Sequence, residues 1–191
     1  MSFRFCVLAT TLSLLAAAPA ARASTYTFDF SGSSGASNPF SLSSNGVTAT
    51  FDSPSGPGTF YVATSGYSSF GTGLGDYASF SGDTLTISFS QAVSGSVAFR
   101  FGLEDLGGLG GNDTLSVSTN GGVSRTFGTA LNALPLPEPE GVAFFSASSF
   151  TTLTLTSAYP FAIGAVSVPE PMSVALLGVG MFGAGLVRRR R

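Results

Sequence analysis

The feature that most constrains the fold of this chain is a two-residue apolar rhythm that recurs between residues 24 and 167. Polar residues separate Tyr26, Phe28 and Phe30, and other runs repeat the same alternation. Successive side chains of a β-strand point to opposite faces of a sheet, so this rhythm predicts half-buried strands. No stretch in this region has the apolar spacing of an amphipathic helix. The body of the chain is therefore expected to be all-β.

Clusters of Gly, Ser, Asn and Pro separate the predicted strands, which cover residues 26–30, 47–51, 59–63, 85–89, 97–101, 114–119, 123–127, 141–145, 150–156 and 161–166. Strands without helices between them favour antiparallel pairing in two packed sheets, an antiparallel β-sandwich. Asn120, Gly121 and Gly122 predict a hairpin turn, because Asn and Gly tolerate positive φ. The Ser- and Gly-rich segment 31–45 is expected to be a mobile loop, and 134–140 a proline-stiffened surface loop.

Length and charge limit the kind of protein further. A chain of 191 residues has room for one domain of ordinary size, and its 18 phenylalanines supply a core without Trp. Between residues 24 and 167, two arginines stand against nine carboxylates, a formal charge of −7. Nucleic-acid affinity comes chiefly from Lys and Arg that neutralise phosphates, so we exclude nucleic acid as a partner.

The first 23 residues have the pattern of a signal peptide. Arg4 provides a positive start, residues 5–18 are apolar, and Ala21 and Ala23 form a small-x-small site before Ser24. Signal peptidase is expected to cut after Ala23. The alternative is an uncleaved anchor helix, but the apolar stretch is shorter than the roughly 20 residues a membrane span needs. Cys6, the only cysteine, precedes this cut, so the mature protein would contain neither a disulfide nor a thiolate metal site.

The last 20 residues have the pattern of a membrane anchor. Residues 172–187 are apolar apart from Ser173, and the basic run Arg188, Arg189, Arg190 and Arg191 follows directly. As a helix this segment would measure about 24 Å, enough for a thin bilayer. The arginines would form a cytoplasmic stop, leaving the body on the far side of the inner membrane. The alternative, a buried C-terminal helix, does not account for the terminal arginines.

The tetrapeptide Val168, Pro169, Glu170 and Pro171 stands immediately before this helix. Two prolines around an acid are expected to stop strand and helix alike and to leave an extended, accessible peptide. The order of tetrapeptide, Gly-rich apolar helix and Arg cluster over 168–191 resembles the PEP-CTERM sorting signal of Gram-negative bacteria. The resemblance implies that a membrane-embedded exosortase recognises the segment and removes the helix. It also implies a host that makes exopolysaccharide and biofilm matrix.

The same three letters occur at Pro137, Glu138 and Pro139, but a strand-like sequence follows them instead of an apolar helix. The context of the tripeptide, and not the tripeptide alone, therefore carries the sorting signal. The body also resembles that of other PEP-CTERM proteins, from Phe101 through residues 113–115 to the closing run 161–167. This resemblance implies a jelly-roll-like sandwich that ends just before the tail.

The absence of histidine removes Ser-His-Asp catalysis and imidazole metal sites. The remaining hydrolytic chemistry is a carboxylate pair across a sugar, for which Glu104 with Asp105 and Glu138 with Glu140 are the available clusters. Acids that are adjacent or on loops more often serve as solvated surface charges. We therefore expect a protein that is not an enzyme, with a carboxylate-dependent glycan hydrolase as the second alternative.

Two further binding sites are candidates. The run from Gly107 to Leu115 resembles the calcium-binding Gly-Gly-x-Gly-x-Asp repeat, and its candidate ligands are Glu104, Asp105, Asn112 and Asp113. Because there is one copy with an extra residue, a flexible turn is the preferred interpretation, and calcium is the one candidate cofactor. Separately, Tyr61, Tyr67 and Tyr77 either stack on a sugar or cap the end of the sandwich.

The sequence thus predicts a signal peptide at 1–23, a β-sandwich at 24–167 and a sorting signal at 168–191. Signal peptidase, exosortase and, transiently, the inner membrane are the expected partners, and exopolysaccharide is a further candidate. The protein is expected at the cell surface or in the extracellular matrix in a structural role. The first alternative is a carbohydrate-binding module.

Overall fold

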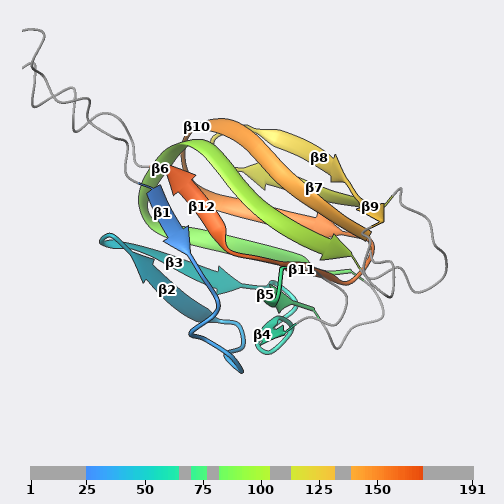
Figure 1. The fold of residues 1–191 in the computed structure, drawn as a ribbon. Helices are drawn as coiled ribbons and strands as arrows, with labels where there is room; N and C mark the ends of the chain where they lie inside the picture. Colours follow the sequence, from blue (N-terminus) through green and yellow to red (C-terminus); the bar gives the residue numbers. More distant parts are fainter. Residues whose placement is uncertain (1–24, 65–69, 77–81, 104–112, 132–138, 170–191) are drawn as a thin grey trace, which may run out of the picture. The chain divides into compact units, whose positions relative to one another are not determined.

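In the computed structural model, the described residues form twelve β-strands (Figure 1). These residues contain no helix. The structure describes residues 25–64, 70–76, 82–103, 113–131 and 139–169. The strands are β1 (Thr25–Phe28), β2 (Phe40–Ser44), β3 (Val47–Asp52), β4 (Tyr61–Thr64), β5 (Thr72–Gly75), β6 (Thr84–Leu103), β7 (Thr114–Thr119), β8 (Ser124–Gly128), β9 (Ala130–Leu131), β10 (Pro139–Ser157), β11 (Phe161–Ile163) and β12 (Val166–Pro169). Every pairing among them is antiparallel, as predicted.

Two long strands, β6 and β10, organise the sheet. They pair with each other from Thr84↔Thr156 to Gly102↔Glu140, with register shifts around Phe150. The first part of β6 also pairs with β3, whereas its last part pairs with β11 and β12. Figure 1 shows the two strands bending together, so that one sheet lies partly over itself. The two layers expected from the sequence are therefore two parts of one hydrogen-bonded sheet with the order β4-β5-β11-β6-β10-β7-β8 at its centre.

The number and bounds of the strands differ from the prediction where β6 and β10 bend. Residues 85–89 and 97–101 belong to one strand, β6, and 141–145 and 150–156 belong to one strand, β10. Gly95 adopts a φ of 106°, which an L-residue rarely adopts, and irregular pairing in β10 faces this position. Backbone irregularity of this kind bends a strand without ending it. Conversely, the predicted strand 161–166 is split between β11 and β12.

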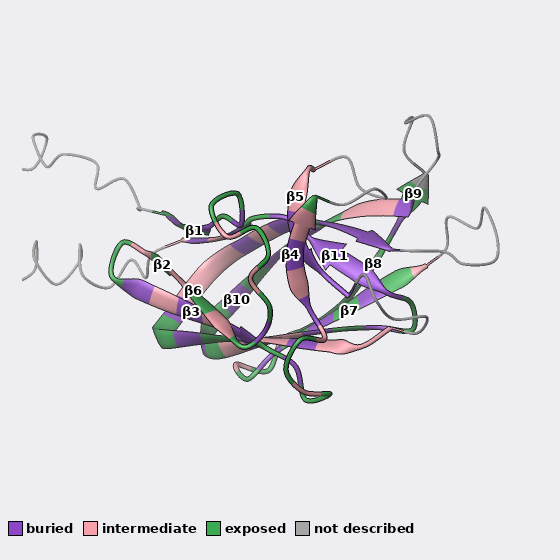
Figure 2. Cartoon of the chain, turned by 90° about the horizontal axis from the view of Figure 1, so that it is seen from below, coloured by how far each residue is buried: buried purple, intermediate pink, exposed green. Residues whose placement is uncertain are grey.

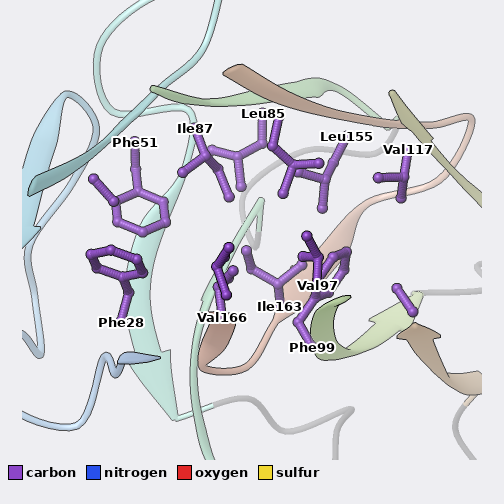
Figure 3. Close-up of a cluster of buried hydrophobic side chains, with 14 of the residues drawn as sticks. Phe28, Phe51, Leu85, Ile87, Val97, Phe99, Val117, Leu155, Ile163 and Val166 are labelled. Atoms are coloured by element: carbon purple, nitrogen blue, oxygen red, sulfur yellow. The ribbon is translucent and has the colours of Figure 1, made fainter. Parts of the chain in front are cut away.

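The core lies between the two layers and is made mostly of phenylalanine and branched aliphatic residues. Figure 2 shows buried and exposed positions alternating along the strands, and Figure 3 shows the side chains that fill the interior. Phe51 is fully buried, with its ring 5.2 Å from that of Phe30 and 5.1 Å from that of Phe40. Tyr26 and Phe28 are also buried, as the apolar rhythm predicts.

The predicted loop at 31–45 contains strand β2, so the loop prediction is wrong for residues 40–44. Strands β2 and β3 form a hairpin through Asn45 and Gly46, both with positive φ. Serine and threonine hydroxyls pair across this hairpin, as between Ser41 and Thr50 at 2.8 Å. The predicted turn at residues 120–122 is confirmed: the Gly122 amide donates to the Thr119 carbonyl oxygen, and Gly122 has a φ of 86°.

The described strands all belong to one compact unit, Ser24–Pro171. The predicted signal peptide and the helix predicted at 172–187 lie outside the described residues. In the part of the chain that is described, no helix has the length and apolar character required to cross a membrane. Within the loop predicted at 134–140, Pro139 and Glu140 instead begin β10, and the rest lies outside the described residues.

Candidate functional site

The last strand, β12, carries the first two residues of the tetrapeptide 168–171. Val166 and Val168 are fully buried, while Ser167 and Pro169 are half-buried on the opposite face. Figure 3 shows Val166 among the core side chains. The sequence predicts a tetrapeptide that is extended and accessible; Val168 is extended, but the prediction that it is accessible is wrong. The alternation of Val166 and Val168 continues the strand, and a proline is tolerated at a strand end because only one ladder position is affected.

Both edges of β12 are paired. On one edge it pairs with β1 in the register Thr25↔Pro169 to Phe28↔Val166, and on the other edge Ser167 lies opposite Ala98 of β6. Figure 1 shows β1 and β12 side by side. The hydroxyls of Thr27 and Ser167 are 3.5 Å apart. The strand that follows the predicted signal-peptide cut therefore pairs with the strand that leads into the tetrapeptide.

Gly95 of β6 provides the surface on which Pro169 rests. A Cβ atom on Gly95 would lie 3.3 Å from Cγ and 3.4 Å from Cβ of Pro169. The proline ring is thus in close contact with the bend in β6. Gly95 is not among the predicted site residues, although an isolated glycine within a strand pattern indicates a bulge or a close backbone approach.

The other side of β1 is held by the β2–β3 hairpin. The Thr27 amide donates to Ser44 Oγ at 3.0 Å, and Asn45 Nδ2 donates to the Thr25 carbonyl oxygen at 3.4 Å. Just after β1, Asp29 accepts hydrogen bonds from the Ser31 amide at 3.0 Å and the Ser31 hydroxyl at 2.9 Å. These bonds, the backbone one first, lower the pKa of Asp29. Strand β1 is therefore anchored along both edges and at its end.

The predicted carboxylate clusters lie mostly outside the described residues. Glu104, Asp105 and Glu138 are among the residues not described, whereas Glu140 is described. Its Oε2 atom is 3.2 Å from Arg100 Nη2, and its side chain is 9% exposed. The ion pair links β6, which carries Arg100, to the neighbouring strand β10, which carries Glu140. This is a structural contact.

Of the four candidate calcium ligands, Asp113 is the one that the structure describes. The other candidate ligands, Glu104, Asp105 and Asn112, lie outside the described residues. The carbonyl oxygen of Asp113 accepts hydrogen bonds from the Thr129 amide and hydroxyl at 3.0 and 3.2 Å. Across the described ranges, no group of three or more Asp, Glu, His or Cys side chains is placed to hold a metal ion.

Among the predicted tyrosines, Tyr61 is half-buried in β4, and Tyr67 and Tyr77 lie outside the described residues. The structure instead exposes two apolar residues that the sequence analysis placed in a strand without singling them out. Val142 and Phe144 of β10 are 61% and 64% exposed. They are two positions apart on one face, opposite Arg100 and Ala98.

The comparison with known protein families found a match that begins in strand β12. The family described as the PEP-CTERM protein-sorting motif matches residues 167–191. The chain carries a PEP-CTERM sorting motif. The motif marks an exported protein that is sorted by exosortase, with processing at the membrane followed by surface location. No curated protein matches the chain. The match begins at Ser167, so the PEP-CTERM motif overlaps strand β12 by three residues, Ser167, Val168 and Pro169.

Proposed function

We propose that this PEP-CTERM protein is a structural, non-enzymatic component of the cell surface or extracellular matrix. The proposal rests on one observation: the sorting motif at 167–191 begins within the last strand of a folded β-domain. Signal peptidase cuts after Ala23, and exosortase removes the tail. Helix 172–187 holds the intermediate in the inner membrane, with Arg188 to Arg191 in the cytoplasm. The body, a jelly-roll-like sandwich, then associates with exopolysaccharide.

Two features of the body support a role without catalysis. The chain has no histidine, and Glu140, the described member of the predicted acid pairs, is engaged by Arg100. In addition, its outer faces carry rows of hydroxyls, such as Ser96 and Ser146 with oxygens 3.1 Å apart. Such surfaces suit hydrogen bonding to hydrated polysaccharide, because hydroxyls both donate and accept.

The two Pro-Glu-Pro triplets of the chain supply a matched test. Glu170→Ala alters the sorting motif, whereas Glu138→Ala alters the triplet that lacks a following apolar helix. In cells that contain the exosortase, Glu170→Ala should accumulate as the tailed precursor in the membrane fraction. Glu138→Ala should be processed like the unaltered protein. The protein recovered outside the cells should then have the intact mass of a chain that begins at Ser24 and lacks the apolar tail. Exterior protein that retains Arg188 to Arg191 would contradict the proposal.

The exposed pair Val142 and Phe144 favours a second function, glycan binding. An exposed aromatic ring can stack on the apolar face of a sugar, and Arg100, opposite Val142, can donate to its hydroxyls. Phe144→Ala should then reduce retention of the purified protein on immobilised exopolysaccharide. Tyr159→Ala, at an exposed aromatic position outside β10, is the control. Equal retention of the two variants and the unaltered protein would exclude this surface.

A further inference from the structure

The first three residues of the PEP-CTERM motif, Ser167, Val168 and Pro169, belong to strand β12 of the folded domain. β1 pairs with one edge of β12 as far as Pro169, and β6 pairs with the other edge at Ser167. Val168 is fully buried in the core beneath the strand, whereas the Pro169 ring is half-buried on the opposite face and lies against Gly95 of β6. Only the outward face, with Ser167 and Pro169 half-buried, remains open.

This arrangement conflicts with recognition of the same residues by an enzyme. An enzyme that binds an extended peptide pairs with its backbone edge and takes alternate side chains into pockets. The backbone edge of β12 that faces β1 is paired as far as Pro169, the other edge is paired with β6 at Ser167, and the Val168 side chain lies in the core. Val168 and Pro169 therefore cannot occupy an enzyme cleft while β12 remains in place.

We propose that the folded domain masks Val168 and Pro169, and that the end of β12 must detach from β1 and Gly95 before exosortase can process the chain. This inference rests on the proposed function, since it concerns the same tail. The apparent affinity of the enzyme is then reduced by the fraction of molecules with a detached strand end. Thr25 to Phe28 and Gly95 are thus positioning residues for the sorting reaction, acting through the strand they hold.

A reversible cross-link between β1 and β12 tests the inference directly. Thr27 and Ser167 are opposite each other, with their hydroxyl oxygens 3.5 Å apart, so Thr27→Cys with Ser167→Cys should form a disulfide in an oxidising compartment. The full chain is expressed with exosortase in a Cys6→Ser background, which removes the only native cysteine. Pulse-chase then follows conversion of tailed precursor to processed protein with and without dithiothreitol.

The matched control cross-links a hairpin away from the motif. Ser41→Cys with Thr50→Cys joins β2 to β3, where the native oxygens are 2.8 Å apart. We expect the oxidised Thr27–Ser167 pair to slow conversion by about tenfold or more, with recovery on reduction, because the detached fraction is suppressed. The control pair should convert at the unaltered rate in both states.

The outcomes separate this inference from the function on which it rests. If the unaltered protein is never processed, the proposed function fails. If it is processed and the oxidised Thr27–Ser167 pair converts equally fast, only the masking of Val168 and Pro169 is refuted. Failure of that pair to cross-link, while the control pair does, would also refute it, because β1 and β12 would then not be adjacent.

A second variant acts in the opposite direction. Gly95 has a φ of 106°, and Gly95→Ala places a Cβ against the Pro169 ring. The substitution should therefore weaken the contact that holds Pro169 in place. Gly122→Ala has comparable backbone strain, at a φ of 86°, but its Cβ would meet no atom within 4 Å. Gly95→Ala should therefore be processed several-fold faster than Gly122→Ala. Equal rates would count against a role for Gly95 in holding the motif.

Discussion

Val168 belongs both to the core and to the sorting motif, and its replacement by alanine should destabilise the domain. The side chain is fully buried, and the substitution removes two methyl groups. At about 0.8 kcal/mol for each buried carbon, the loss of transfer free energy is about 1.6 kcal/mol. The space left behind raises the expected cost to about 2–3 kcal/mol. Ser167→Ala, one position earlier and half-buried, should change the free energy of unfolding by no more than about 0.5 kcal/mol.

Urea unfolding of the exported protein measures this difference. The chain has five tyrosines and no tryptophan, so far-ultraviolet circular dichroism or tyrosine fluorescence reports the transition. With an m-value of about 2 kcal/mol/M, Val168→Ala should lower the urea midpoint by about 1 M, whereas Ser167→Ala should lower it little. A midpoint for Val168→Ala that is no lower than that of Ser167→Ala would refute the placement of Val168 in the core.

Two other side chains give predictions that can be checked separately. Asn120→Ala should reduce the free energy of unfolding by about 1–3 kcal/mol, because Asn120 Oδ1 accepts from the Thr151 and Thr152 amides at 2.9 and 3.1 Å. Asn120→Asp, which keeps an acceptor, should cost less in the same urea titration. Ser31→Ala should raise the pKa of Asp29 towards its ordinary value, as followed by carboxyl NMR, because the hydrogen bond from the Ser31 hydroxyl to Asp29 is lost. Since the pKa of Asp29 is lowered on folding, its contribution to stability is present above the unfolded pKa and is lost as the pH falls through the folded one. An unchanged pKa would show that the Ser31 hydroxyl does not stabilise the carboxylate.

The regular parts of the fold were predictable because alternation alone defines them. Strand β7 occupies residues 114–119, as predicted, with Leu115 and Val117 buried. Strand β6 was predicted as two pieces because the alternation lapses between Phe89 and Val97, where the strand bends. The local sequence does not show that β6 continues through the bend, because that continuity depends on pairing with β10, which lies elsewhere in the chain.

Strand β2 was missed because composition was given more weight than pattern. Ser41 and Ser43 face outward and bond to Thr50 and Thr48, so a Ser-rich segment is here a strand with hydroxyl pairs instead of a loop. The signal that would have found it is Asn45 followed by Gly46, a strong hairpin dipeptide. Strand β5 is glycine-rich because a Cβ on Gly73 would lie 2.8 Å from the Ile163 carbonyl oxygen. This contact with β11 is set by tertiary packing.

The position of the sorting motif was predictable, and its overlap with the sheet was not. The order of tetrapeptide, apolar run and arginines is local in sequence, whereas the burial of Val168 depends on β1 and β6 from elsewhere in the chain. The expectation that a proline ends a strand was applied one residue too early. Pro169 occupies the last position of β12, where its missing amide hydrogen interrupts no later pairing.

The overlap also limits where the tail can be removed without damage to the fold. A cut between Ser167 and Val168 would take a fully buried side chain from the core and leave Thr25 and Tyr26 of β1 without their partners. A cut after Pro169 leaves every residue of β12 in the sheet. Pro169 is the last described residue of the strand, so bonds on its C-terminal side are those whose cleavage preserves the described core. The fold thus favours a product that retains Val168 and Pro169, even though the same two residues must leave the sheet for the enzyme to bind them.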